Sequence, residues 1–150
     1  MKLFEYAAKE VFRRAGIPVP RGRAVSTPAE AAEVAREVGV PVAVKAQVLA
    51  GGRGKAGGIR FAHDPEEAAE AAEALLGRQL RGYTIERVLV EEKLEIRREL
   101  YAGIAVDTGL RRPVLIASAH GGVDIEEVPE KHIVRRPIDP AWGLQQYACR

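Results

Sequence analysis

The sequence predicts an α+β fold of two lobes, because helix and strand signals alternate in its first part and strand signals alone fill the rest. Two helix starts have similar residues, at 27–30 and at 64–67, and each helix lies between short apolar runs. Beyond position 95, apolar and alternating stretches are separated by glycine-containing turns, as in antiparallel strands. We therefore expect a mixed first lobe over residues 1–97 and an incomplete antiparallel second lobe over residues 98–150.

Three helices are predicted in the first lobe. Apolar residues recur at helical spacing from Leu3 to Ala15, and Gly16 stands where a helix commonly ends. Thr27-Pro28-Ala29-Glu30 combines a capping box with proline at the first helical position, which predicts a helix from there to Gly39. Asp64-Pro65-Glu66-Glu67 predicts another helix that runs to Leu76. A further helix is expected to begin at Gly143.

The strands are predicted from short apolar or alternating runs. In the first lobe these runs cover residues 24–25, 42–46, 59–62 and 88–91. In the second lobe they cover residues 99–106, 114–118 and 132–138, with turns at 107–109 and 120–122. Residues 124–130 fit either a turn of helix or irregular chain.

The composition is that of an ordinary soluble globular protein, with 47% hydrophobic and 29% charged residues in a chain of 150. The net charge is +2 with both signs mixed along the chain, and aromatic residues make up only 5%, which argues against nucleic-acid binding. The single cysteine, Cys149, excludes an internal disulfide framework. Neither a membrane-spanning run nor a signal peptide is recognisable, so we expect a cytoplasmic protein with no membrane contact.

Residues 42–59 predict a hairpin whose tip is rich in glycine. Five glycines fall between positions 51 and 58, and they allow backbone N–H groups to turn toward an anion. Lys45 lies within the strand, and Arg53 and Lys55 add two cations near the tip. A fixed ammonium group beside a glycine loop is typical of a phosphate site. The alternative is a flexible, solvated loop with surface charges.

The segment that joins the lobes has the features of a nucleotide hinge. An apolar strand ends at Glu91, Leu94 follows three residues later, and Glu99 comes after a charged stretch. Such a strand end can offer backbone groups to a purine edge, and a nearby carboxylate can accept from both ribose hydroxyls. The alternative is a plain strand followed by a charged turn.

The chain resembles the N-terminal part of the β-subunits of succinate–CoA ligase (succinyl-CoA synthetase), which belong to the ATP-grasp superfamily. The resemblance covers essentially all 150 residues, and that is well under half of the family's full length. Its most specific part is VKAQV at 44–48 followed by AGGRGKAGG at 50–58. It is supported by MKLFEYAAKE at 1–10, LVE at 89–91, ELY at 99–101 and GGVDIEEV at 121–128.

The resemblance implies an ATP-grasp-like fold and a set of nucleotide contacts. Lys45 would contact the phosphates, and the lid over them would be formed by Gly52, Arg53 and Gly54. Glu91 and Leu94 would meet the adenine, and Glu99 the ribose. Members of the family that use adenine nucleotides resemble this chain at Pro20, so the resemblance favours ATP over GTP.

The resemblance also implies the rest of the reaction, in which ATP, succinate and coenzyme A give acyl-CoA, ADP and phosphate. The phosphorylated histidine belongs to the α-subunit, so His63, His120 and His132 are expected to be surface or strand-edge residues. The Mg²⁺ ligands lie beyond position 150, and no catalytic residue is expected in this chain, which alone should be inactive.

Other functions fit the same residues. The acid could be malate or citrate, because no residue of this chain is expected to contact it. A non-catalytic anion-binding or docking module would also use the glycine hairpin, and a nucleic-acid binder is the weakest alternative. We also expect self-association of this chain through the second lobe, because an apolar face and a sheet edge would stay exposed there.

Overall fold

The computed structural model describes residues 2–146 and divides the chain into two compact units. The first unit ends at Leu94 and the second begins at Glu95. This division falls three residues before the boundary that we expected from the sequence. The two units are described separately below.

A four-stranded antiparallel sheet forms the centre of the first unit. Its strands lie in the order β1 (Gly22–Val25), β6 (Val88–Glu92), β2 (Val42–Ala46) and β3 (Ile59–Ala62). The four predicted apolar runs are confirmed as strands, and β2 and β3 form the predicted hairpin. The strand β6 is central, so residues on it pair with β1 on one side and with β2 on the other.

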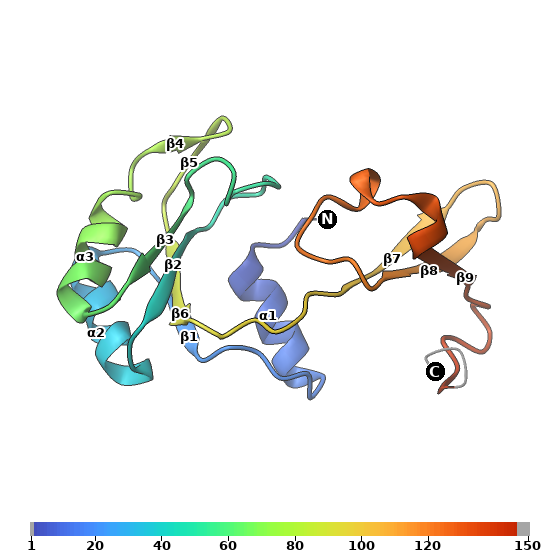
Figure 1. Ribbon diagram of the computed structural model, residues 1–150, viewed down its shortest axis with the longest axis horizontal. Helices are drawn as coiled ribbons and strands as arrows, with labels where there is room; N and C mark the ends of the chain where they lie inside the picture. The colour runs from blue at the N-terminus through green and yellow to red at the C-terminus, as the bar shows by residue number, and fades with distance from the viewer. Residues whose placement is uncertain (1, 147–150) are drawn as a thin grey trace. The chain divides into compact units, whose positions relative to one another are not determined.

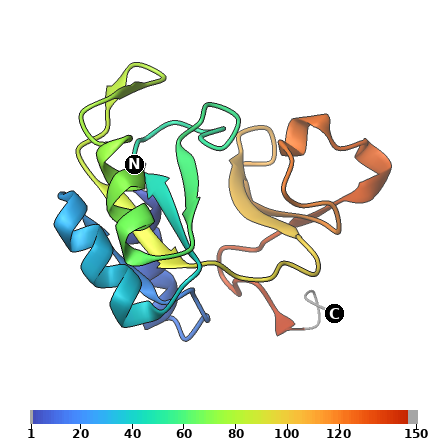
Figure 2. The same cartoon turned by 60° about the vertical axis from the view of Figure 1, so that its left-hand side comes forward.

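Helices α2 (Pro28–Val38) and α3 (Pro65–Glu73) cover one face of this sheet (Figures 1 and 2). The predicted helix starts are confirmed: Thr27 and Glu30 form a capping box, and the Asp64 side chain accepts from the Glu67 N–H. Alternate residues of the strands face these helices and form the core with them. The buried strand residues are Val25, Val42, Val44, Ala46, Ala62, Val88 and Val90.

The end of α3 differs from the prediction. The helix stops at Glu73 instead of Leu76, and the chain then turns so that the Gly77 N–H donates to the Ile85 carbonyl at 2.9 Å. A small hairpin follows, β4 (Gln79–Leu80) and β5 (Tyr83–Thr84), which the sequence analysis missed. Its two-residue loop has positive φ at both Arg81 and Gly82, at 50° and 84°. Two-residue hairpin loops are usually recognised in a sequence by an Asn-Gly or Asp-Gly pair. Arginine is unusual at the first position of such a loop, so this sequence lacks that signal.

The opposite face of the sheet carries α1 (Glu5–Arg14) (Figure 1). Strand alternation directs Lys45 of β2, and Leu89 and Glu91 of β6, to this face. None of the α1 side chains is fully buried, although Leu89 and Ala43 on this face of the sheet are only 3% and 4% exposed. The polar contacts between α1 and this face form the candidate site.

Gly22 of β1 allows this strand to lie close to β6 beside Glu91. It pairs with Glu91 across β1 and β6 at a φ of 152°. A Cβ atom here would lie 2.2 Å from the Val90 carbonyl oxygen and 2.7 Å from the Glu91 Cβ. Only glycine therefore allows β1 to lie this close to the strand that carries Glu91.

The second unit contains an antiparallel sheet in the order β7 (Tyr101–Asp107), β8 (Arg112–Ser118) and β9 (Ile133–Pro137), as predicted. Residues 124–130 contain the short 3₁₀ helix η1 (Ile125–Glu127) and the start of η2 (Glu130–His132). The register brings several exposed or half-buried apolar residues onto one face of the sheet. They are Ala102, Ile104, Val106, Leu115, Ala117 and Val134.

The prediction of a helix that begins at Gly143 is wrong for residues 143–146. Gly143 forms an isolated bridge with Asp139, and a Trp142 N–H to Asp139 carbonyl bond closes a turn there. The rest of that expected helix, and Cys149, lie outside the described residues. Within residues 2–146, no helix has the length and apolar character needed to cross a membrane.

Candidate functional site

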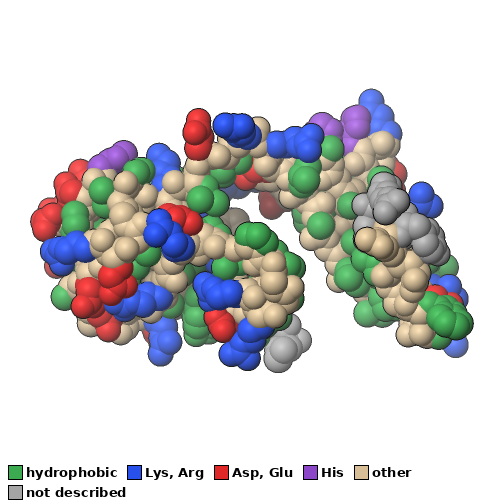
Figure 3. Space-filling view, turned by 90° about the horizontal axis from the view of Figure 1, so that it is seen from below, with side chains coloured by type: hydrophobic (Ala, Val, Ile, Leu, Met, Phe, Trp, Pro, Cys, Tyr) green, Lys and Arg blue, Asp and Glu red, His purple; other side chains and the backbone are tan. Residues whose placement is uncertain are grey.

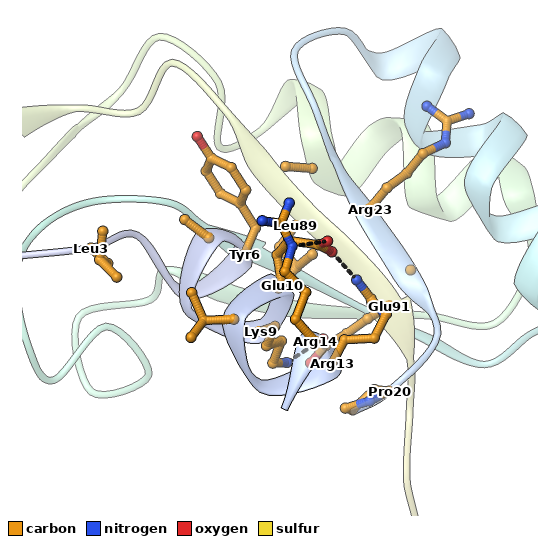
Figure 4. Close-up of a pocket in the computed structure, with 14 residues that line it drawn as sticks. Leu3, Tyr6, Lys9, Glu10, Arg13, Arg14, Pro20, Arg23, Leu89 and Glu91 are labelled. Carbon is orange, nitrogen blue, oxygen red and sulfur yellow. Dashed lines mark hydrogen bonds and ion pairs between the residues drawn. The ribbon is translucent and has the colours of Figure 1, made fainter. Parts of the chain in front are cut away.

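The candidate site is centred on Glu91, a buried carboxylate on the central strand β6. Its side chain is only 3% exposed and lies in two ion pairs. Its Oε1 lies 2.7 Å from the Lys45 Nζ. Its Oε2 accepts a hydrogen bond from the Lys9 Nζ, and Figure 4 shows both of these residues, Lys9 and Glu91. A buried charge is strongly unfavourable unless it is paired. Both oxygens are therefore satisfied by lysines, one from β2 and one from α1.

A second carboxylate, Glu5 of α1, joins these lysines to the glycine loop. Its Oε1 lies 3.0 Å from the Lys9 Nζ and 3.4 Å from the Lys45 Nζ. Its Oε2 accepts from the Arg53 Nη2 at 2.7 Å. Two cations from different segments, Lys45 and Arg53, thus bind the two oxygens of one anion. We call Glu5, Lys9, Lys45, Arg53 and Glu91 the five-charge cluster.

The cluster shifts the pKa values of its members. Burial favours the neutral form of Glu5, but the charges of Lys45, Lys9 and Arg53 outweigh it and hold its pKa at about 2. Burial also favours neutral Lys45, yet its hydrogen bond to Glu91 and the charge of Glu5 raise its pKa above the ordinary lysine value. Both groups are therefore ionised throughout the physiological pH range.

The glycine loop follows β2 and closes on itself. Three of its N–H groups, those of Ala56, Gly57 and Gly58, donate to the carbonyls of Gly52, Gly54 and Arg53. The Arg53 Nη1 donates to the Ala46 carbonyl at 2.9 Å, which ties this side chain to the base of the loop. Gly52 and Gly57 have φ of 66° and 74°, so glycine is required for this path.

The β4–β5 hairpin contacts the glycine loop at two points. A Cβ at Gly58 would lie 2.7 Å from the Leu80 Cδ2, and a Cβ at Gly52 would lie 2.9 Å from the Arg81 Nη2. The hairpin thus supports the loop and brings the Arg81 guanidinium beside it. The sequence analysis did not single out Arg81, because the hairpin itself was not predicted.

A pocket of about 480 Å³ lies between α1 and strands β1 and β6. Figure 4 shows Lys9 and Glu91 among its lining residues, together with Pro20 and Arg23. Four cations of α1 and β1 line this pocket, and each has a carboxylate partner. Besides Lys9, these are Arg13 and Arg14, which pair with Glu10, and Arg23, which pairs with Glu33 and Glu37. Over the first unit in Figure 3, basic and acidic side chains are mixed.

The structure brings several of the predicted residues together in the first unit. Lys45, Arg53 and Glu91 belong to the five-charge cluster, and Gly52 and Gly54 lie in the adjoining loop. Leu94 is exposed at the end of the first unit. Glu99 belongs to the second unit, where its carbonyl accepts from the Gly121 N–H at 3.1 Å. Glu5 and Lys9 were missed, although both lie in the MKLFEYAAKE stretch that carries part of the resemblance.

The three histidines lie outside the five-charge cluster. His63 is exposed, and the His120 and His132 rings lie 4.6 Å apart at the surface of the second unit. In the described part of the chain, no group of three metal-ligating side chains of the His, Cys, Asp and Glu types gathers.

The comparisons with known protein families and with known sequences agree with each other. The family described as an ATP-grasp domain matches residues 2–150. The β-subunit of succinate–CoA ligase [ADP-forming] from Halobacterium salinarum is 54% identical over all of this chain, and that from Methanothermobacter thermautotrophicus is 53% identical. The chain covers 40% and 42% of these two relatives, so it spans well under half of their length.

Solved structures show the same fold. A dinucleotide-forming acetyl-coenzyme A synthetase from Ca. Korarchaeum cryptofilum, in complex with coenzyme A and Ca-AMPCP, matches 90% of this chain and 59% of its own. The TM-score is 0.74 at 27% identity. An ATP citrate lyase from Methanothrix soehngenii matches 95% of this chain and 36% of its own, with a TM-score of 0.72 at 21% identity.

The low pKa of Glu5 predicts an acid-sensitive contribution to folding. A carboxylate whose pKa is lowered from 4.5 to about 2 stabilises the folded state above pH 4.5, and this stabilisation is lost as the pH falls toward 2. The shift corresponds to about 3 kcal/mol of unfolding free energy. We expect the wild type to lose about that much more between pH 6 and pH 2 than the Glu5→Gln variant does, as measured by denaturant unfolding.

The exposed Glu33 supplies the control, because Glu33→Gln removes a surface carboxylate that pairs with Arg23. Its acid profile should follow the wild type. If Glu5→Gln also follows the wild-type profile, the cluster does not stabilise the charge of Glu5.

Proposed function

Because this chain belongs to the ATP-grasp domain family, we propose that it is the nucleotide-binding N-terminal part of the β-subunit of an ADP-forming succinate–CoA ligase. The whole enzyme would convert succinate, coenzyme A and ATP to succinyl-CoA, ADP and phosphate. It would do so in the cytoplasm, with a histidine of the α-subunit carrying the phosphoryl group. The identity to β-subunits over the whole chain supports this proposal.

The observation that carries the nucleotide role is the shared contact of Lys45 and Arg53 with Glu5. One carboxylate is bonded at both oxygens by these two cations, so their spacing suits the oxygens of a phosphate group as well. Lys45 is fixed in a strand and oriented by Glu91, and Arg53 is anchored to the Ala46 carbonyl. In the proposal, both hold the triphosphate, and the backbone of Gly52 and Gly54 closes over it.

The remaining contacts are assigned along the chain that leaves β6. We propose that the backbone near Glu91 and Leu94 meets the adenine, and that Glu99 accepts from the ribose hydroxyls. Both oxygens of the Glu91 side chain are occupied by lysines, so this residue would serve the base through its backbone and the phosphates through Lys45. Mg²⁺, when bound, would neutralise the phosphate charge. The proposal assigns its ligands to the part of the relatives' length that this chain does not span.

The identity of the acid substrate is tested separately from nucleotide binding. The complete gene product, assembled with its α-subunit, is given ATP, coenzyme A and one of three acids: succinate, malate or citrate. Mass spectrometry should then find succinyl-CoA with matching ADP release. Malyl-CoA or citryl-CoA as the main product would show that malate or citrate, not succinate, is the acid substrate. ADP release that does not depend on any of the three acids would favour the non-catalytic anion-binding or docking module.

Lys45→Ala should weaken ATP binding far more than adenosine binding, because Lys45 is assigned to the phosphates. The loss of one charge-assisted hydrogen bond is worth about 1.5–3 kcal/mol, or roughly tenfold to a hundredfold in Kd. Calorimetry on the complete gene product measures both ligands. Lys131→Ala removes the same charge from the second unit and should leave both affinities unchanged. Equal losses for ATP and adenosine in Lys45→Ala would refute the phosphate role.

We further propose that the 150-residue chain by itself self-associates through the second unit. Ile104 and Val106 of β7 are 62% and 72% exposed, and they share one sheet face with Leu115 and Val134. Burying such a face against a second copy removes apolar surface from water. Sedimentation should show a mass that rises with concentration and falls back in Val106→Asp. A monomer at every concentration would contradict this.

A further inference from the structure

The turn that follows β8 is built around Glu99. Residues 93–100 form neither helix nor strand, so no regular element fixes the direction of the Glu99 side chain. The Gly121 N–H donates to the Glu99 carbonyl at 3.1 Å, which brings residues 121–122 against this irregular segment. The turn is itself fixed, because the His120 N–H donates to the Ser118 Oγ at 3.0 Å and the His120 ring packs on His132.

The two glycines of this turn contact different parts of Glu99. A Cβ at Gly121 would lie 2.6–2.7 Å from backbone atoms of Glu99 and Leu100. A Cβ at Gly122 would lie 2.2 Å from the Glu99 Oε2 and 3.2 Å from its Oε1. The carboxylate therefore rests directly on the Cα of Gly122. Gly121 sets the position of the backbone, and Gly122 leaves the space that the carboxylate occupies.

We propose that Gly122 is a positioning residue for ribose recognition, acting through the Glu99 carboxylate. This inference rests on the proposed function, in which Glu99 accepts from the ribose hydroxyls. A hydroxyl pair on a five-membered ring demands two acceptor oxygens in a fixed orientation, and an exposed glutamate on irregular chain does not hold one unaided. Gly122 supplies the orientation by allowing the carboxylate to lie flat against the turn.

The experiment compares ATP with 2′-deoxy-ATP in the complete gene product. The wild type should bind ATP about tenfold more tightly than 2′-deoxy-ATP, because removal of the 2′-hydroxyl deletes one hydrogen bond to a charged acceptor. Gly122→Ala displaces the carboxylate, so its preference should fall to within about twofold. The loss of affinity should be larger for ATP, which has two hydroxyls on the carboxylate, than for 2′-deoxy-ATP, which keeps only the 3′-hydroxyl.

Gly143 provides a matched control for backbone strain. Its φ of 67° is close to the 72° of Gly122, but a Cβ there would meet no atom of residues 2–146 within 4 Å. Gly143→Ala therefore carries a similar strain without the contact, and it should keep the wild-type preference. An equal loss of preference in both variants would show that strain, not the contact with Glu99, is responsible.

A double-mutant cycle separates this inference from the proposed function. If Gly122 acts through Glu99, then Gly122→Ala should cause no further loss of preference in a Glu99→Gln background. If Glu99→Gln loses the preference and Gly122→Ala keeps it, the inference is wrong and the ribose role of Glu99 stands. If Glu99→Gln keeps the wild-type preference, the ribose role fails and the inference fails with it. Should Gly122→Ala not fold, Gly122→Asn tests the same contact, because asparagine adopts positive φ more readily.

Discussion

The first unit depends on the pairing of one buried carboxylate, that of Glu91. It lies on the central strand β6, is 3% exposed, and is bonded at one oxygen by Lys45 and at the other by Lys9. Removing one partner of such a pair is expected to cost about 3–5 kcal/mol, because a buried charge is left behind. Gly22 allows β1 to pass beside it, and α1 is attached to the sheet through the same charges. The sheet face that carries α1 thus combines buried apolar residues with a network of ion pairs.

Local signals predicted most of the fold. The helix starts at Thr27 and Asp64 were found because capping is written in adjacent residues, and the strands were found because each is a short apolar run. The end of α3 and the β4–β5 hairpin were missed, because helix ends vary with tertiary context and the Arg81-Gly82 turn lacks the usual asparagine or aspartate. The prediction of a helix at Gly143 was based on a residue pattern that lacks a helix-capping signal.

The site was predicted less completely than the fold. Lys45 and Arg53 were recognised as cations beside a glycine loop, since residue type and spacing suffice for that. Their partners were not recognised, because the ion pairs join positions far apart in the chain: Glu5 to Arg53 spans 48 residues, and Lys9 to Glu91 spans 82. Nothing in the local sequence of Glu91 reveals that its carboxylate faces α1. That direction follows from strand register, which is a property of the assembled sheet.

The five-charge cluster also restricts how this sequence can change over time. Glu5 contacts three cations, and Lys9, Lys45 and Glu91 each contact two opposite charges, whereas Arg53 pairs with Glu5. A neutral replacement at one of these positions unbalances charges in a largely buried setting, whereas a compensating change at a partner position restores the balance. Substitutions at positions 5, 9, 45, 53 and 91 should therefore be accepted together or not at all. We therefore expect these five positions to change together among relatives, even though they come from three separate stretches of the chain and the strand β6.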